Sequence, residues 1–487
     1  MASRDPRRPN VLFILSDDQG PWAMHCAGNA DIVTPTLDAI AASGVRFTDF
    51  FCASPVCSPA RASLLTGDIP SRHGVHDWIR AGNTGAERID YLAGQTLITD
   101  VVGAAGYRCG LVGKWHLGAS DMPRAGYARW YAHPSGMSPY YDVPMFDETR
   151  KVSVARYLTD EITDHALAFV HGEAARAEPF WLSLNYTAPH YPWIDSHPRE
   201  FTALYTDCRF DSCPDLPPHP WNAHGNPATD EGHHRRRESL IGYFAATTAM
   251  DAGIGRVLAA LDALGLREST LVIFMSDNGM NCGHHGIWGK GNGTRPQNMY
   301  DSSVKVPCLF SQPGRIAPGI CDALLSAYDV YPTLLDYLGV AYAPDRPRPG
   351  TSFRTLLDGK ANETAREAVH DRDVVVYDEY GPVRMVRTRA WKYVHRYPEG
   401  PHELYDLVHD PEERVNLVDA VERRERVLAM RARLDDWFAR YADPARDGAR
   451  KRVTGCGQLG LTPSEGDGRD VFPADPIAPL AVPARAR

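Results

Sequence analysis

The stretch Cys57–Gly67 (CSPARASLLTG) places a cysteine beside features that attract an anion. Pro59 suits the first turn of a helix, because an N–H at that position would have no partner in the helix. Cys57 and Ser58 would then lie at a helix N-terminus, where free N–H groups and the helix dipole favour negative charge. Arg61 adds a planar guanidinium that matches a tetrahedral oxyanion. The stretch predicts a reactive side chain beside a sulfate or phosphate, and the alternative is a buried, inert thiol.

Two apolar segments, 9–16 and 269–276, end in pairs of oxygen-bearing side chains. The four side chains that follow them are Asp17, Asp18, Asp277 and Asn278. Continuous apolar runs of this kind are typical of parallel strands buried on both faces, and such sheets bind ligands at the carboxyl ends of their strands. Oxygen ligands alone fit a hard cation such as Ca²⁺ or Mg²⁺, and not zinc. The two strand ends together predict a cation site, although either pair taken alone is more typical of a solvated turn.

Basic groups follow other predicted strands and loops. An extended conformation through YRCGLVGKWHLG would point Lys114 and His116 to one side, because side chains alternate along a strand; the alternative is a surface lysine beside a capping histidine. His190 follows the buried strand 179–186 and lies at the same carboxyl edge. Lys290 belongs to a glycine-rich loop that lacks the GK[ST] sequence of a P-loop. A lysine and a histidine that converge at a strand end suit anion binding and proton transfer.

Two motifs resemble those of a known family. Cys57–Gly67 resembles, at every position, the type I sulfatase signature C-[ST]-P-[AS]-R-x-x-aliphatic-aliphatic-T-G, and GKWHLG (113–118) is similar to the second signature of the family. Ala60 stands where many members have serine, which the pattern allows. The resemblance covers residues 10–417 and implies a sulfuric ester hydrolase of the arylsulfatase type, in the alkaline phosphatase superfamily. It also implies that a formylglycine-generating enzyme oxidises Cys57 to Cα-formylglycine, whose hydrated aldehyde is the nucleophile.

The same resemblance implies roles for the candidate residues. One divalent cation, Ca²⁺ with Mg²⁺ as the alternative, would be coordinated by formylglycine at position 57 and by Asp17, Asp18, Asp277 and Asn278. Arg61 would hold the formylglycine hydroxyl and the oxyanion, and His116 would contact the second hydroxyl of the hydrated aldehyde. The groups that bind sulfate oxygens would be Lys114, His190 and Lys290.

The chemistry explains why these residue types are needed. A sulfate ester is anionic, so a cation, an arginine and two lysines must offset the charge on the transferring group. His190 or Lys290 would protonate the leaving alcohol, and His116 would deprotonate the remaining hydroxyl so that sulfate is expelled. The expected substrate is an aryl or carbohydrate sulfate ester, either a small molecule or a saccharide. Two alternatives are a phosphonate or phosphate monoester hydrolase on the same scaffold, and an anion-binding protein with unmodified Cys57.

The elements that must position these residues change in type along the chain. Strands and helices alternate over the first 365 residues, which predicts an α/β fold with a large, mostly parallel sheet covered by helices on both faces. Short, turn-separated segments then predict a smaller C-terminal antiparallel sheet, followed by a charged helix over 415–441. We therefore expect a catalytic domain at 1–365, an α+β subdomain at 366–445 and a poorly ordered tail at 446–487.

Composition narrows the classes of partner and the location. The net charge is −9 and there is no long basic block, which argues against nucleic acid. No apolar stretch approaches the roughly 20 residues of a membrane span, and the run 11–15 is too short for a signal-peptide core, so we expect a cytoplasmic protein. The ten cysteines have no CxxC spacing, which argues against zinc or a redox pair. A reducing location disfavours disulfides, but a local pair between Cys208 and Cys213 stays open.

Overall fold

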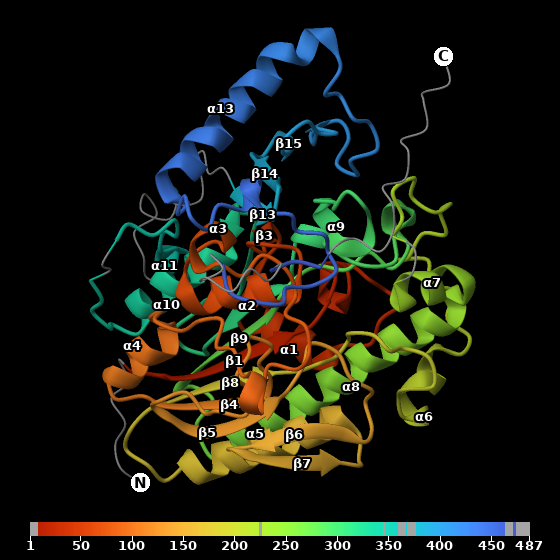
Figure 1. The fold of residues 1–487 in the computed structure, drawn as a ribbon. Helices are drawn as coiled ribbons and strands as arrows, with labels where there is room; N and C mark the ends of the chain where they lie inside the picture. Colours follow the sequence, from red (N-terminus) through yellow and green to blue (C-terminus); the bar gives the residue numbers. More distant parts are fainter. Residues whose placement is uncertain are drawn as a thin grey trace.

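The computed structural model of the chain describes residues 8–223, 226–343, 346–358, 367, 376–462 and 471–473. A ten-stranded sheet with helices on both sides makes up most of the molecule, and a four-stranded sheet lies beside a long helix at the blue end of the colour scale (Figure 1). The predicted α/β class with a smaller C-terminal sheet is therefore confirmed. The predicted domain limits stay a prediction, because the boundary at residue 365 lies outside the described residues.

The large sheet has the strand order β11-β2-β10-β9-β1-β8-β4-β5-β6-β7. Its central strands, from β9 to β5, are parallel, whereas β10 is antiparallel to both of its neighbours and β6 is antiparallel to β5 and β7. The sheet is therefore mixed, with the predicted parallel order at its centre. The short connections on either side of β6 require antiparallel pairing with β5 and β7, since a parallel pair needs a long crossover. The strands are β1 (Asn10–Ser16), β2 (Val45–Phe47), β4 (Arg108–Lys114), β5 (Tyr127–His133), β6 (Val143–Asp147), β7 (Arg150–Val154), β8 (Phe180–Asn185), β9 (Thr270–Ser276), β10 (Cys308–Ser311) and β11 (Gly319–Cys321).

The register of the central strands brings their carboxyl ends together at one edge of the sheet. Leu12 of β1 lies opposite Leu182 of β8 on one side and Val272 of β9 on the other. Parallel strands in this register end at the same level, so the residues that follow them share one edge. The last residues of the central strands are Ser16, Ser276, Asn185, Lys114 and His133.

Alternate residues of β1 face two separate apolar layers, because side chains point to opposite faces along a strand. Val11, Phe13 and Leu15 belong to one buried cluster, and Leu12 and Ile14 belong to the other. The longer helices that contribute to the first layer are α2 (Cys57–Thr66), α4 (Ile98–Ala104) and α10 (Val330–Tyr337), and those of the second are α1 (Pro35–Ala42), α5 (Leu158–Glu173) and α8 (Arg236–Ala263) (Figure 1). Burial on both sides explains why the strands read as continuous apolar runs.

The long helix α8 is apolar enough, by length and composition alone, to cross a membrane. Within the fold, however, 67% of its most apolar window is buried. It packs lengthwise against α5 and the sheet, with Ala246, Met250 and Ile254 in the second apolar layer. A helix that is apolar on most of its circumference is typical of a protein core, so burial accounts for its composition.

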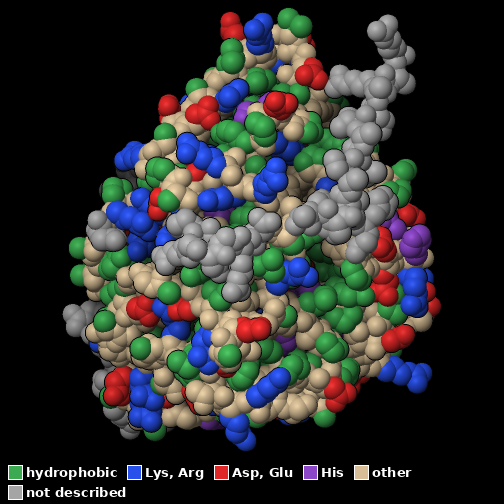
Figure 2. Space-filling view, in the orientation of Figure 1, with side chains coloured by type: hydrophobic (Ala, Val, Ile, Leu, Met, Phe, Trp, Pro, Cys, Tyr) green, Lys and Arg blue, Asp and Glu red, His purple; other side chains and the backbone are tan. Residues whose placement is uncertain are grey.

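Several shorter elements connect the larger ones, and two of them, β3 (Phe50–Phe51) and β12 (Leu325–Ser326), pair as a parallel two-stranded sheet. The short helices are α3 (Pro70–His73), α6 (Arg199–Thr202), α7 (Pro227–His234), α9 (Asp301–Val304) and α11 (Arg354–Leu357). Charged side chains of both signs are scattered over the face of the molecule in Figure 2, so the face shown there has no large basic area.

The C-terminal sheet is antiparallel throughout, as the sequence predicts. Its strands β13 (Val376–Tyr380), β14 (Val383–Arg387), β15 (Trp391–Arg396) and β16 (Glu403–Asp406) pair in chain order. The helix α13 (Arg424–Tyr441) packs its buried side chains Met430, Leu434 and Phe438 against this sheet. The helix begins later than the predicted residue 415, because residues 416 and 417 bond to β16 instead: Asn416 Oδ1 accepts a hydrogen bond from Leu404 N (2.9 Å), and Leu417 N donates to the Leu404 carbonyl (2.8 Å).

The tail predicted to be poorly ordered is held in place over its first part. The Gly448 N–H donates to Ser71 Oγ (2.8 Å), and the Arg446 guanidinium donates to the Arg72 carbonyl (2.8 Å). A composition rich in Pro, Gly and charge does not reveal such hydrogen bonds to distant residues, and the poor order expected for 446–487 stays a prediction. Segments 463–470 and 474–487 lie outside the described residues.

Cys208 and Cys213 are both free thiols, so the local disulfide left open by the sequence does not form.

Candidate active site

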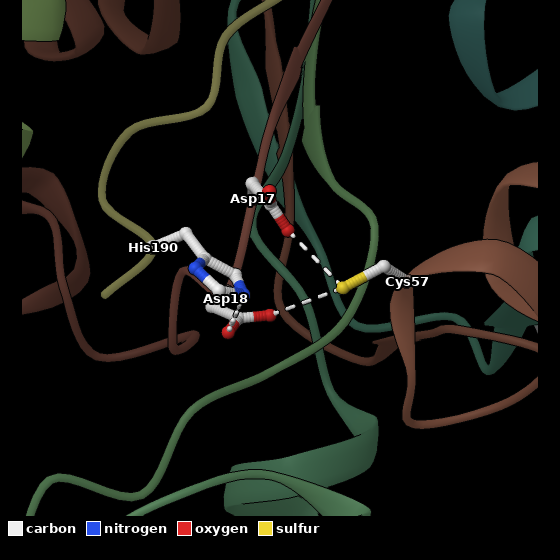
Figure 3. A group of neighbouring side chains, drawn as sticks. All are labelled: Asp17, Asp18, Cys57 and His190. Atoms are coloured by element: carbon white, nitrogen blue, oxygen red, sulfur yellow. Dashed lines mark hydrogen bonds and ion pairs between the residues drawn. The ribbon is translucent and has the colours of Figure 1, made fainter. Parts of the chain in front are cut away.

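Four side chains from three parts of the chain point toward one another at the carboxyl edge of the sheet (Figure 3). Asp17 and Asp18 follow β1, Cys57 begins α2, and His190 lies in the loop after β8. Cys57 Sγ is 3.3 Å from Asp17 Oδ1 and 3.8 Å from Asp18 Oδ1, and His190 Nε2 is 3.5 Å from Asp18 Oδ2. One ligand atom from each of the four lies within 4.8 Å of the others. The group is a compact set of donors with the means to hold a metal ion.

The pairing of β1 with β9 adds the second pair of oxygen-bearing side chains. Ser16 and Ser276 are register partners, so Asp17 and Asp277 leave their strands at the same level. Asp277 Oδ1 accepts a hydrogen bond from Asp18 N (3.2 Å), and Asn278 Nδ2 donates to Asp18 Oδ1 (2.9 Å). Two strand ends that are 260 residues apart in sequence therefore form one buried cluster.

Cys57 occupies the start of α2, as the proline pattern predicts. The preceding residue, Val56, is extended, and the helix runs from Cys57 to Thr66. Lys290 Nζ donates to Cys57 Sγ (2.7 Å). Burial alone would raise the pKa of the thiol, but Lys114 and Lys290 lower it to about 7. Charged rather than apolar groups thus surround this cysteine, and the lowered pKa of its thiol is typical of a reactive residue and not of an inert one.

The predicted basic residues bind the predicted carboxylates. Lys114 forms an ion pair with Asp17, and Lys290 forms one with Asp18. Arg61 donates from Nε to Asp277 Oδ2 (2.9 Å) and from its terminal nitrogen Nη1 to the Lys114 carbonyl (3.0 Å). All of these side chains are buried. Three carboxylates are therefore matched by three permanent cations, so a bound divalent ion would make the site net positive and suited to an anion.

The surroundings move the pKa values of this cluster in opposite directions. Burial raises the pKa of Asp277 to about 6, and the neighbouring Asp17 adds to the rise. Burial also favours neutral Asp18, but Lys290 and His190 outweigh it and hold the pKa of Asp18 below its ordinary value. For His190, burial disfavours the charged ring, yet Asp18 and Asp17 raise its pKa above the ordinary value. His190 is thereby suited to hold a proton.

His116 has a different environment. Its φ of 55° lies in the left-handed region, and its Nε2 is 2.8 Å from the Ile79 carbonyl oxygen. A carbonyl only accepts hydrogen bonds, so Nε2 carries the proton and Nδ1 has the lone pair. Among the described residues Nδ1 has no hydrogen-bond partner, although it is buried. Burial and then the nearby Lys114 hold the pKa of His116 well below its ordinary value, which leaves a neutral ring with an available lone pair.

The donor set fits a hard divalent cation. Besides the three carboxylates, Asn278 offers an amide oxygen that is buried and has no hydrogen-bond partner among the described residues. A buried acceptor without a donor is costly unless a cation or a water satisfies it. Carboxylate and amide oxygens are the ligands that Ca²⁺ and Mg²⁺ prefer. These side chains can therefore hold such an ion, together with an oxygen ligand at position 57.

The structure brings nearly all of the predicted site residues into one cluster. They are Asp17, Asp18, Cys57, Arg61, Lys114, His190, Asp277, Asn278 and Lys290. His116 lies beside the cluster and is joined to α2 through Ser58, whose Oγ donates to the His116 carbonyl (2.9 Å).

Two supporting residues escaped the sequence analysis. Asn185, the last residue of β8, donates from Nδ2 to the Lys114 carbonyl (2.9 Å), and Tyr140 donates its hydroxyl to the His190 carbonyl (2.8 Å). Asn185 could have been found by the rule that identified Asp17, because it too ends a buried strand. Tyr140 lies in an irregular loop, where no pattern in the sequence points to it.

Known families and relatives match most of the chain. Residues 9–340 match the Sulfatase family profile, and residues 283–439 match the profile described as N-sulphoglucosamine sulphohydrolase, C-terminal. An ulvan-active sulfatase of Formosa agariphila is 30% identical over 459 residues, which cover 90% of this chain and 83% of the relative. Human arylsulfatase A is 30% identical over 456 residues, which cover 85% and 84% of the two chains.

Solved structures agree with this assignment at the level of the fold. A protein solved in complex with its substrate D-glucosamine-2-N,6-O-disulfate superposes with a TM-score of 0.74 at 23% identity, over 90% of this chain and 99% of that one. The phosphonate monoester hydrolase of Agrobacterium radiobacter has a TM-score of 0.65 at 22% identity, over 89% and 96%. Sulfatases generally use a formylglycine and a divalent metal, and this chain has a cysteine within an acidic cluster. The chain belongs to the sulfatase family and is a sulfuric ester hydrolase.

Proposed function

We propose that the enzyme hydrolyses an aryl or carbohydrate sulfate ester with a formylglycine made from Cys57 and one bound Ca²⁺, with Mg²⁺ as the alternative ion. The observation that carries the proposal is the convergence of Cys57 with two acidic strand ends and with Lys114 and Lys290. A formylglycine-generating enzyme is the partner that this maturation requires. When these groups are in place, the hydrated aldehyde supplies the nucleophilic hydroxyl, and the cation polarises it and offsets charge on the sulfate.

The chain's own residues would bind and orient the sulfate group. Lys114 and Lys290 already lie on the two sides of the acidic pair, so an anion could exchange for part of their carboxylate contacts. Arg61 is fixed by Asp277 and by the Lys114 carbonyl, which leaves its guanidinium plane beside residue 57. Fixed donors of this kind stabilise charge that develops during the transfer without reorganising at the moment of reaction.

Two histidines would move protons at different steps. Asp18 and Asp17 raise the pKa of His190, which favours its protonated form, and this ring would protonate the alcohol oxygen as its bond to sulfur breaks. His116 has a neutral ring with a free Nδ1 lone pair, which suits the removal of a proton from the remaining hydroxyl. That removal would return the aldehyde and expel sulfate. The two rings therefore differ in charge in the way that an acid and a base require.

The substrate class is supported by the relatives. Those named above include an ulvan-active sulfatase and an arylsulfatase, and an N-acetylglucosamine-6-O-sulfatase of Bacteroides thetaiotaomicron is 25% identical over 513 residues. The chemistry at sulfur is common to aryl and carbohydrate esters, whereas the alcohol is recognised outside the cluster described here.

The test is mass spectrometry of the peptide that contains Cys57, from protein made together with a formylglycine-generating enzyme. We expect the mass of formylglycine or its hydrate, and sulfate release from 4-nitrophenyl sulfate in proportion to the modified fraction. An unmodified thiol together with sulfate release would refute the role of formylglycine. Faster hydrolysis of a phenylphosphonate ester than of the sulfate, measured in parallel, would favour a phosphonate monoesterase.

A further inference from the structure

A segment near the C-terminus runs along one edge of the loop formed by residues 74–80, which borders the active site. We call residues 455–462 the strap. The Gln458 N–H donates to the Trp78 carbonyl (2.8 Å), and the Arg80 N–H donates to the Gln458 carbonyl (3.2 Å). Ile79 and Gln458 thus form a parallel β-bridge, although 379 residues separate them in the sequence. The strap therefore adds one strand-like residue to the segment 78–80.

The side chain of Gln458 fixes the same loop a second time. It is fully buried, and its Oε1 accepts hydrogen bonds from the backbone N–H of His76 (2.8 Å) and of Asp77 (3.4 Å). Its Nε2 donates to the carbonyls of Gly74 (3.0 Å) and Gly460 (2.8 Å). Both donors and both lone pairs of the amide are therefore used, which makes this glutamine a specific anchor rather than a surface residue.

Neighbouring contacts bring the strap close to the loop. Asp77 Oδ2 accepts a hydrogen bond from Gly457 N (3.0 Å), and Trp78 Nε1 donates to the Gly455 carbonyl (3.0 Å). Gly457 has a φ of 103°, and a Cβ there would meet Arg80 Cγ at 2.6 Å. Only glycine permits both this backbone conformation and this approach.

The opposite edge of the same loop contacts the active site. The Ile79 N–H donates to Ser58 Oγ (3.0 Å), and the Ile79 carbonyl accepts the Nε2 proton of His116 (2.8 Å). Ser58 Oγ in turn donates to the His116 carbonyl (2.9 Å). A closed ring of hydrogen bonds therefore joins Ile79, the residue after Cys57, and His116.

The two edges are linked by the geometry of an extended chain. Along such a chain the backbone groups of one residue point to one side, and the flanking carbonyl and N–H point to the other. Pairing of Trp78 and Arg80 with Gln458 therefore fixes the direction in which Ile79 presents its own N–H and carbonyl. We propose that Gln458 is a positioning residue, which acts through Ile79 to hold His116 in its tautomer and orientation and Ser58 at the start of α2.

The proposal rests on the proposed role of His116 as the base that releases sulfate. It is tested with Gln458→Ala, which removes the four side-chain hydrogen bonds. Thr462→Val is the matched control, because Thr462 Oγ1 donates to the Gly74 carbonyl (2.6 Å) from the same strap. Both variants are compared with wild type at equal formylglycine content, measured by mass spectrometry, with 4-nitrophenyl sulfate as the substrate.

We expect Gln458→Ala to lower kcat by about 10-fold or more with little change in KM, since small displacements of catalytic groups are costly. Thr462→Val should retain the wild-type kcat. Hydrogen exchange should become faster at the amides of Ile79 and Arg80 in Gln458→Ala, and not in Thr462→Val. In a His116→Ala background, Gln458→Ala should have little further effect on kcat, because both substitutions remove the same function.

Each way in which the proposal could fail would give a different experimental result. A kcat of Gln458→Ala equal to that of the control, or an equal loss of kcat in the His116→Ala background, would overturn the positioning role. If His116→Ala itself kept full turnover, the proposed role of His116 would be wrong. In that case faster exchange at Ile79 in Gln458→Ala would show that the strap still orders the loop, but the positioning of a base would be refuted.

Discussion

Two clusters of acidic and basic side chains in this enzyme, one buried and one partly exposed, differ in the neutral acceptors that they leave unpaired. The junction cluster lies where the small sheet meets the large one and consists of Asp49, Asp301, Lys305, Arg387, Lys392 and Glu413. Like the active-site cluster, it matches three carboxylates with three cations. Charge balance therefore does not distinguish a binding site from a structural ion network.

The difference lies in the neutral acceptors. In the active-site cluster the Asn278 amide oxygen, and beside it His116 Nδ1, lack donors among the described residues. In the junction cluster the atoms without a hydrogen-bond partner among the described residues belong to charged groups: they are Arg387 Nε, which is a donor, and Glu413 Oε1, which is ion-paired with Lys392. The other contacts join charges and backbone: Lys392 Nζ donates to the Met299 carbonyl (2.9 Å), and Asp301 N donates to Glu413 Oε2 (2.7 Å). Unused lone pairs beside a helix N-terminus thus mark the place where a ligand completes the network.

The largest effect should come from Cys57, which has no counterpart in the junction cluster. Cys57→Ser supplies a hydroxyl that can be sulfated but has no second hydroxyl for the release of sulfate. We expect turnover to fall by at least about a thousand-fold, the scale on which loss of a nucleophile acts in other hydrolases. Intact-mass measurement after incubation with 4-nitrophenyl sulfate should find a sulfated protein. Full turnover by this variant would contradict release through an aldehyde.

Lys392→Met should separate stability from activity. It leaves the buried Glu413 without its lysine, and loss of one partner from a buried ion pair costs about 3–5 kcal/mol. The half-buried Asp301 also loses one of its cations. We expect the free energy of unfolding, from urea denaturation, to fall by this amount while kcat per folded molecule is kept. Arg150→Met is the control, since it removes an exposed pair with Asp147 and should change stability by less than about 1 kcal/mol. A loss of kcat with unchanged stability would mean that the junction cluster takes part in catalysis.

The smallest effect should come from substitution of Asp378, and its effect on stability should depend on pH. Both of its carboxyl oxygens are buried without a hydrogen-bond partner in the described part of the chain, and burial raises its pKa well above the ordinary value despite Lys392. The folded protein therefore keeps this proton while the unfolded chain loses it, so the contribution to stability falls as pH rises above the unfolded value. We expect Asp378→Asn to stabilise the enzyme at pH 7 and to have less effect near pH 4, measured by thermal unfolding. A stabilisation that is the same at both pH values would show that Asp378 is ionised in the fold.

The sequence revealed the active-site cluster far better than the junction cluster, for a physical reason. Asp17 and Asp277 each follow a buried strand and Lys114 ends one, and parallel strands in register must bring such residues to one edge. Cys57 was identifiable because proline and arginine at fixed offsets mark a helix start beside an anion. Glu413 and Lys392 come from an irregular segment and an antiparallel strand, where local pattern does not predict which distant residues meet.

The same limit explains why the strap and the antiparallel edge of the sheet were not predicted from the sequence. Gln458 bonds to backbone more than 370 residues away, and backbone groups have no identity that a sequence can display. The antiparallel pairing of the edge strands β6 and β7 depends on the short connection between them. Residues whose side chains meet at strand ends were therefore predictable, and residues whose partners are backbone groups were not.

Calcium binding tests the contrast between the clusters most directly. Isothermal titration of Ca²⁺ would be carried out on the wild type, on Asp18→Asn and on Asp49→Asn, each of which removes one carboxylate from one cluster. We predict one ion per chain for the wild type and for Asp49→Asn, and binding weakened by at least about 10-fold, or lost, for Asp18→Asn. Equal Ca²⁺ affinity in Asp18→Asn and the wild type, or loss of binding in Asp49→Asn alone, would contradict the assignment of the cation to the cluster around Cys57.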